Sequence, residues 1–276
     1  MRVSVPASTA NLGAGFDCLA LALEERFHLD VGEPHGPHSV PVPAGHPAAV
    51  AFAQAQGSGD IFFTSTIAPG KGMGYSGAAR VAGLAAGWLS RCGWVDHPEV
   101  CRLASDLEGH ADNAAASVYG GLVVAAAGRV IRMKPPLGVR VVMWVPDGAT
   151  STAKARSTLP DQVSLADAVE NIGRASLMVA ALATGDLAAI RDACQDQLHQ
   201  QLRLANRPES TTALEAATNH ELALGAWLSG SGPSVAALAT AEHAPTVADA
   251  LPGSGHTKVL PIATFGIRVG AGAELD

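Results

Sequence analysis

The chain has 276 residues, of which 48% are hydrophobic and 16% charged, and its formal net charge is −7. This composition excludes a disordered chain, and 18 Lys and Arg against 25 Asp and Glu leave no cationic surface suited to nucleic acid. The apolar stretches fall short of the ~20 residues of a membrane span, and the N-terminus lacks the features of a signal peptide. We therefore expect a cytoplasmic protein with no membrane or nucleic-acid partner and a core of Ala, Val and Leu.

Hydrophobic periodicity, taken in chain order, predicts alternating groups of strands and helices. Strands are expected at 2–5 (ending at Pro6), 18–31 and 61–67, with a loop at 34–43 and a helix at 47–56. A glycine loop at 69–77 precedes helices at 78–91 and 99–107, and strands follow at 121–127, 130–133 and 139–145. Most of 165–217 is expected to be helical, and the last part to contain strands at 222–228, 235–239 and 256–262 and a helix at 244–251.

Strands and helices that cluster in this way, without a regular βαβ repeat, predict an α+β fold. A division near residue 145 separates two predicted domains, 1–145 with the glycine loop and 146–276 contributing to a substrate pocket. The Ala-rich apolar surface is compatible with a homodimer.

The cysteines and a histidine-containing loop give no metal signal. Cys18, Cys92, Cys101 and Cys194 form no Cys-x-x-Cys pair, so we expect reduced thiols. His35, His38 and His46 lie in a Pro/Gly stretch without carboxylates, which favours a solvated loop over a metal site.

The first polar, glycine-rich segment, residues 6–17, carries Asn11 and Asp17 beside two glycines that permit a tight bend. It is either an ordinary loop between strands or a substrate pocket in which Asp17 holds a cationic or hydroxyl group.

The second segment, residues 69–79, lies between a predicted strand and an Ala-rich helix. Small residues expose backbone N–H groups, and the helix adds the positive end of its dipole, so the loop suits phosphate oxygens. The spacing Gly72-x-Gly74-x-x-Gly77 also matches the dinucleotide fingerprint, with Asp96 at the distance of its acidic residue but no convincing strand before it. A P-loop is excluded, and the Ser76 hydroxyl is available to a phosphate-bound metal.

The third segment, residues 108–113, contains Glu108, a candidate magnesium ligand or a surface carboxylate at a helix end. His110 is more typical of a structural histidine than of a base.

Together these segments resemble the GHMP small-molecule kinases and, within them, the homoserine kinase family. Residues 6–17 match that family's PASTANLGPGFD at all positions but Ala14, and residues 108–113 resemble its EGHPDN. Residues 69–79 resemble the ATP loop of the superfamily, and residues 152–160 resemble the family's T-x-x-A-R…LP stretch. His199 to Arg203 match a His-x-x-x-Arg segment of the family, and residues 228–234 are similar to its third glycine motif. The resemblance implies a two-lobed fold with mixed or antiparallel sheets packed against helices.

The resemblance also implies the site. The amino acid would be surrounded by Asn11, Asp17, Asn113, Thr152, Arg156 and Arg203. Asp17 suits its ammonium, and the two arginines, which would otherwise form surface ion pairs, suit its carboxylate. Asp17 and Asn113 are the expected catalytic residues, and Ser76 and Glu108 would hold Mg²⁺. The triphosphate of ATP would be wrapped by Pro69, Gly70, Lys71, Gly72, Met73, Gly74, Tyr75, Ser76, Gly77, Ala78 and Ala79.

The ATP loop departs from the family pattern at three points. Tyr75 replaces the first serine, Gly77 replaces an alanine, and the loop is one residue short. A phenol is bulky where a small hydroxyl usually lies close to phosphate, so we expect Tyr75 to weaken ATP binding or alter nucleotide choice.

The implied activity is transfer of the γ-phosphoryl group of ATP to the hydroxyl of L-homoserine, a step of threonine biosynthesis. The alternatives are a kinase of the same superfamily for another small hydroxylated metabolite and a nucleotide-binding homologue with impaired catalysis.

Overall fold

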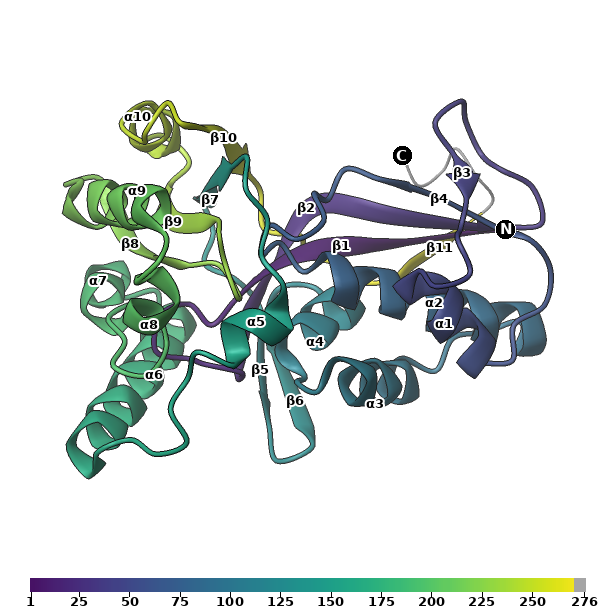
Figure 1. Ribbon diagram of the computed structural model, residues 1–276, viewed down its shortest axis with the longest axis horizontal. Helices are drawn as coiled ribbons and strands as arrows, with labels where there is room; N and C mark the ends of the chain where they lie inside the picture. The colour runs from purple at the N-terminus through teal and green to yellow at the C-terminus, as the bar shows by residue number, and fades with distance from the viewer. Residues whose placement is uncertain (271–276) are drawn as a thin grey trace.

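The computed structural model describes residues 1–270 and contains two antiparallel sheets (Figure 1). In the larger sheet the strand order is β11-β1-β2-β4-β3, and β5 also pairs with β2 and with β6. The smaller sheet has the order β10-β7-β9-β8. The strands of the larger sheet are β1 (Arg2–Ala10), β2 (Leu19–Val31), β3 (Val40–Pro41), β4 (Ile61–Ser65), β5 (Leu122–Ala126), β6 (Arg129–Met133) and β11 (Arg268–Gly270). Those of the smaller sheet are β7 (Val139–Pro146), β8 (Ala223–Leu228), β9 (Val235–Thr240) and β10 (Gly255–Leu260).

Helices cover both sheets. Helices α2 and α4 contact β1 and β2, with α1 and α3 packed against them, whereas α7, α9 and α10 contact the smaller sheet (Figure 1). The helices are α1 (Pro47–Gln54), α2 (Tyr75–Cys92), α3 (His97–Glu108), α4 (Asp112–Tyr119), α5 (Thr152–Arg156), α6 (Leu165–Thr184), α7 (Ile190–Ala193), α8 (Gln200–Leu204), α9 (Pro208–Asn219) and α10 (Ala244–Asp249), with a 3₁₀ turn at Leu187–Ala189.

The predicted α+β class with antiparallel sheets packed against helices is confirmed. The larger sheet takes strands from the first half of the chain and also β11, which pairs with β1 through Arg2 to Ser4. The division into domains at residues 145 and 146 stays a prediction.

The predicted end of the first strand at Pro6 is wrong, because β1 continues to Ala10. Proline has no N–H to give to the ladder, and the structure accommodates it where the register with β2 shifts between Pro6 and Ala7. The Pro6 carbonyl still accepts a hydrogen bond from Ser117 Oγ of α4 at 3.0 Å. The bulge lets the strand deliver Asn11, just beyond its end, to the interior of the molecule.

Five further elements differ from the prediction. Helix α2 begins at Tyr75 rather than residue 78, and α4 replaces what was expected as a short Ala-rich turn. Strand β3 lies within the segment 34–43 that was expected to be a loop, and α5 and β11 were not predicted. The remaining predicted strands and helices are present, with ends shifted by a few residues. In the described part of the chain, no helix is both long and apolar enough to cross a membrane.

The core is built from small residues, as expected, and this allows helices to approach closely. Gly83 of α2 packs on α1 so tightly that a Cβ there would lie 2.2 Å from the Ala48 carbonyl oxygen. Gly173 of α6, by contrast, has nothing within 4 Å of a Cβ.

These two helical glycines give a matched test of the packing. We expect Gly83→Ala to destabilise the fold by about 1–3 kcal/mol, because neither backbone can retreat. Gly173→Ala is expected to stabilise it by about 0.5–1 kcal/mol, because alanine has the higher helix propensity and space is open. Urea unfolding of both variants measures the difference, and equal effects of the two substitutions would contradict this packing.

Candidate active site

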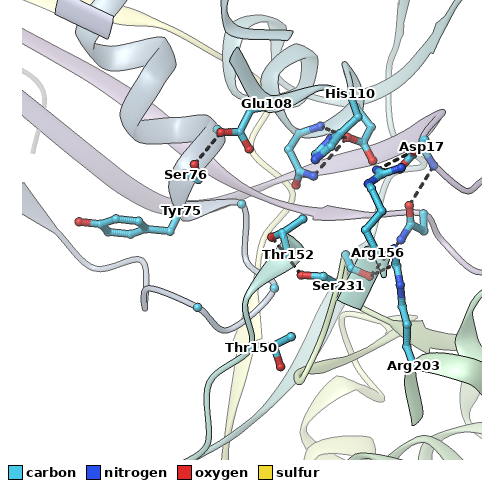
Figure 2. A pocket seen from close by; sticks show the side chains of 18 residues that line it. Asp17, Tyr75, Ser76, Glu108, His110, Thr150, Thr152, Arg156, Arg203 and Ser231 are labelled. Atoms are coloured by element: carbon cyan, nitrogen blue, oxygen red, sulfur yellow. Dashed lines mark hydrogen bonds and ion pairs between the residues drawn. The ribbon is translucent and has the colours of Figure 1, made fainter. Parts of the chain in front are cut away.

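A cavity of about 240 Å³ lies where the glycine loop, the loop after β1, α4 and α5 converge (Figure 2). All the sequence-predicted amino-acid and metal residues line it, namely Asn11, Asp17, Ser76, Glu108, Asn113, Thr152, Arg156 and Arg203. Of the predicted ATP loop, Gly70, Gly72, Gly74, Tyr75 and Gly77 also line it. Met73, Ala78 and Ala79 are instead buried in the core, and Pro69 is exposed.

The glycine loop has a backbone that only glycine fits. Gly70, Gly72 and Gly74 have φ of +69°, +75° and +70°, and a Cβ would lie 2.2 Å from Ser229 O at Gly72 and 2.0 Å from Ser8 Oγ at Gly74. Helix α2 starts directly after Gly74, and no side chain caps its first turn. Its free N–H groups and positive dipole end therefore belong to the wall of the cavity, an arrangement suited to an anion.

A buried hydrogen-bonded junction joins the glycine loop to both sheets. Ser229 Oγ, after β8, donates to the Gly72 carbonyl oxygen at 2.7 Å and lies 2.8 Å from Thr9 Oγ1 of β1. Trp227 Nε1 donates to the same Thr9 hydroxyl at 2.9 Å. One turn of the smaller sheet thus fixes both the glycine loop and the end of β1.

Lys71 links the glycine loop to the segment before α5. Its ammonium donates to the carbonyl oxygen of Gly148 at 2.8 Å and to those of Pro146 and Asp147. The Thr150 N–H donates to Gly70 O at 2.8 Å. These contacts place α5, which carries Thr152 and Arg156, beside the loop.

The Tyr75 side chain points away from Ser76 and Glu108 (Figure 2). Its hydroxyl lies 2.8 Å from His46 Nε2, and its ring packs edge-on against Phe27. Because His46 Nδ1 accepts from the Ala48 N–H that begins α1, the neutral ring donates from Nε2 to the phenol oxygen. Burial lowers the pKa of His46 and raises that of Tyr75, which favours these neutral forms. His46, expected in a solvated loop, is thus a helix cap, while the effect of Tyr75 on nucleotide binding stays a prediction.

Ser76 and Glu108 place two oxygen atoms that could bind a metal next to each other. Ser76 Oγ donates to Glu108 Oε1 at 2.6 Å, and Arg80, one helical turn after Ser76, forms an ion pair with the same carboxylate. Hydroxyl and carboxylate oxygens are ligands that Mg²⁺ prefers. These two oxygen atoms suit the predicted metal, which would share the Glu108 carboxylate with Arg80.

The loop after β1 is held in a left-handed conformation that directs its polar side chains inward. Asn11 and Asp17 have φ of 74° and 56°. Asn11 Oδ1 accepts from the Asp17 N–H at 3.1 Å, and its Nδ2 donates to Gly230 O at 3.0 Å. The Asn11 side chain thus fixes the loop from inside, which is a structural reason for an amide at this position.

Asp17 faces the two predicted arginines. Arg156 Nη2 donates to both Asp17 carboxylate oxygens, at 2.9 and 2.8 Å. Arg203 is buried and donates to Gly230 O at 3.0 Å. Burial lowers the pKa of Arg203, whereas the Asp17 carboxylate opposes this shift. One carboxylate and two guanidinium groups therefore share one end of the cavity.

His110, which sequence reasoning favoured as a structural histidine, also lines the cavity. Its Nδ1 donates to Asp112 Oδ1 at 2.6 Å, and this oxygen also accepts from the Asn113 N–H at 2.7 Å. The hydrogen bond to Asp112 raises the pKa of His110, against the opposing effect of burial. Ser8 Oγ in turn donates to Asn113 Oδ1 at 2.8 Å.

Other lining residues were not predicted as site residues: Asp112, Thr150, Gly230 and Ser231. Gly230 and Ser231 belong to the third glycine motif and Asp112 to the segment 108–113, so the motifs carried a signal for them. Thr150 lies outside every motif.

Asp17, His110 and Asp112 also have potential metal-ligand atoms within 4.8 Å of one another. Both carboxylates, however, already form ion pairs, Asp17 with Arg156 and Asp112 with His110.

Comparison with known proteins identifies relatives over nearly the whole chain. The profiles of the GHMP kinases N terminal domain and the GHMP kinases C terminal match residues 46–121 and 178–257. A homoserine kinase of Thermus thermophilus is 39% identical over 264 residues, which cover 89% of each chain. A homoserine kinase of Streptomyces coelicolor is 37% identical over 281 residues, covering 92% of this chain and 89% of the relative.

Solved structures agree with these relatives. The crystal structure of homoserine kinase from Cytophaga hutchinsonii superimposes with a TM-score of 0.84 at 26% identity, over 97% of this chain and 96% of that one.

The pair of His110 and Asp112 predicts a pH dependence of stability. Because the folded-state pKa of His110 is raised above 6.5, its stabilising effect is full below that value and is lost as the pH rises through the folded-state pKa. The difference in free energy of unfolding between the wild type and His110→Gln should therefore shrink from pH 5.5 to 8.5. Urea unfolding at a series of pH values measures it, and a constant difference would show that the pair does not titrate in this way.

Proposed function

Because the chain belongs to the homoserine kinase family of the GHMP kinases, we propose that it transfers the γ-phosphoryl group of ATP to the side-chain hydroxyl of L-homoserine. The products are O-phospho-L-homoserine and ADP. In such a transfer the acceptor hydroxyl forms the new P–O bond and loses its proton, while the bond to the β-phosphate oxygen breaks.

One observation carries the assignment: a helix N-terminus preceded by a glycine loop shares a cavity with one carboxylate and two guanidinium groups. The first feature suits the phosphates of ATP, and the second suits a zwitterion. Both features line the same cavity of about 240 Å³.

The amino acid binds by exchanging partners with an internal ion pair. In the free protein Asp17 and Arg156 neutralise each other. The substrate ammonium takes the place of Arg156 at Asp17, and the substrate carboxylate takes the place of Asp17 at Arg156 and Arg203. A planar guanidinium grips both oxygens of a carboxylate, so this exchange replaces one charged contact by several. Asn11 keeps the Asp17 loop in place, and Thr152 closes the pocket beside Ser231, 3.4 Å away.

Asn113 orients the acceptor hydroxyl. Its side chain is held by Ser8, and its backbone N–H donates to Asp112, so the amide is fixed before substrate binds. Phosphoryl transfer depends mainly on alignment and neutralisation of charge, and it needs little covalent chemistry from the protein. Asp17 is the candidate acceptor for the hydroxyl proton.

The nucleotide end of the cavity is assigned to the glycine loop and the start of α2. Ser76 and Glu108 would hold Mg²⁺, which supplies neutralisation of the phosphate charge when bound. Glu108 is shared with Arg80, which keeps the carboxylate near the helix.

The direct test is ADP release from Mg-ATP with L-homoserine as acceptor, with O-phospho-L-homoserine identified by ³¹P NMR. We expect L-homoserine to be preferred over L-threonine and over small sugars, because both charged ends of the amino acid are matched. If the protein phosphorylates another acceptor but not L-homoserine, it is a different kinase of the superfamily. If calorimetry detects nucleotide binding but no acceptor is phosphorylated, the protein is a nucleotide-binding homologue without catalytic activity.

Arg156 provides the sharpest variant for the amino-acid pocket. Loss of a charge-assisted hydrogen bond of about 1.5–3 kcal/mol predicts that Arg156→Ala raises the KM for homoserine about 10- to 100-fold. The KM for ATP should stay within about twofold, since Arg156 lies at the other end of the cavity. Arg102→Ala is the matched control, because within the described part of the chain its guanidinium pairs only with Glu99 and Asp106, on the surface of α3. A change in the KM for ATP as large as that for homoserine would contradict the assignment.

A further inference from the structure

Phe16 lies next to Asp17 in the loop after β1 and is not among the residues that line the cavity. Three cationic or titratable side chains from elsewhere in the chain surround its ring. The Arg203 guanidinium carbon lies 5.0 Å from the ring centroid and that of Arg156 5.6 Å. The His199 ring stacks on Phe16 with centroids 4.9 Å apart and an interplanar angle of 28°. One aromatic ring therefore contacts both guanidinium groups assigned to the substrate carboxylate.

The two guanidinium groups need an attractive partner, because they repel each other. This repulsion is one of the effects that lower the pKa of Arg203. The face of an aromatic ring carries a negative quadrupole, and a cation within about 6 Å of its centroid is stabilised by roughly 0.5–2 kcal/mol. Both distances to Phe16 fall within this range.

The two arginines differ in which of their other contacts substrate binding would displace. Arg203 is also held by Gly230 O at 3.0 Å and lies 3.4 Å from His199 Nδ1. Arg156 belongs to α5, a helix of only five residues, and among the described residues it forms an ion pair with Asp17 alone. In the proposed reaction the substrate ammonium takes Asp17 from Arg156. Of the side-chain contacts of Arg156 among the described residues, the one to the ring of Phe16 is not displaced by the substrate ammonium.

We infer that Phe16 is a positioning residue that sets selectivity for acceptors bearing a carboxylate. This inference rests on the proposed function. The ring holds the guanidinium groups of Arg156 and Arg203 next to each other, so that both can face one carboxylate when the ion pair with Asp17 opens. His199, stacked on the ring and bonded through Nε2 to Gly13 O at 3.0 Å, fixes the ring in turn.

The test compares two acceptors that differ only in the carboxylate, L-homoserine and 3-aminopropan-1-ol. We expect Phe16→Leu to raise the KM for homoserine about tenfold, with kcat and the KM for ATP within about twofold. The inhibition constant of 3-aminopropan-1-ol against homoserine should stay unchanged, because this ligand lacks the group that the arginines bind. Equal losses for both ligands, or a loss for neither, would overturn the inference, since a residue that only supports the fold does not discriminate between them.

A matched control is Phe265→Leu. Phe265 also lies under an arginine, Arg268, at 5.7 Å, but outside the cavity. This variant removes the same kind of contact and should leave the selectivity between the two ligands unchanged.

A second variant separates the electronic role of the ring from its shape. Fluorinated phenylalanines placed at position 16 keep the size of the ring and weaken its negative face step by step. The affinity for homoserine, measured by calorimetry, should fall with each added fluorine, and a flat series would overturn the inference even if Phe16→Leu does not fold. A wild-type protein that does not phosphorylate homoserine rejects the proposed function itself, whereas an active wild type with unselective variants rejects only the role of Phe16.

Discussion

The buried contact of Thr9, Ser229 and the Gly72 carbonyl is the constraint on which the rest of the site depends. It joins three segments that are far apart in the chain: the end of β1, the turn after β8 and the glycine loop. Each hydroxyl or carbonyl would be costly if left unpaired in the interior, so the three segments are held together or not at all. Gly72 can approach Ser229 only because it lacks a Cβ. The position of the glycine loop relative to the loop that carries Asp17 is therefore fixed by packing between the two sheets.

The same cavity is rich in charge, and in the free protein most of that charge is internally paired. Asp17 is paired with Arg156, Glu108 with Arg80, and Asp112 with His110. Such pairs avoid the cost of isolated charges in a partly buried site, and they leave groups of both signs ready for a ligand that carries both. In the proposed binding step, a zwitterion exchanges partners with the pair of Asp17 and Arg156 without adding net charge to the cavity. A neutral or singly charged molecule has no equivalent exchange, and this links the electrostatics of the pocket to the choice of acceptor.

The sequence was most informative where a residue type is required by chemistry or backbone geometry. The glycines of the predicted ATP loop, Asp17 and the two arginines were identified as candidates from motifs, and they line one cavity. Predictions were wrong where tertiary structure overrode a local rule: Pro6 was expected to end β1, but a register shift accommodates it. Helix α4 was missed because its Ala-rich sequence is short and follows a polar segment, although burial against β1 stabilises it. The direction of Tyr75 depends on His46, a partner 29 residues away, and no local pattern encodes such a pairing.

The late position of β11 in the chain means that β1 is synthesised long before the strand that pairs with it. The first strand of the chain is completed on one side by one of the last described segments, through Arg2 to Ser4, and Arg26 is satisfied by the carbonyl oxygens of Phe265 and Gly266. Until β11 has been synthesised, the edge of β1 at Arg2 to Ser4 has no neighbour, and such an open edge can pair with another nascent chain. A polysome translating this protein therefore carries many such edges at once, which favours association between neighbouring nascent chains until β11 pairs with β1.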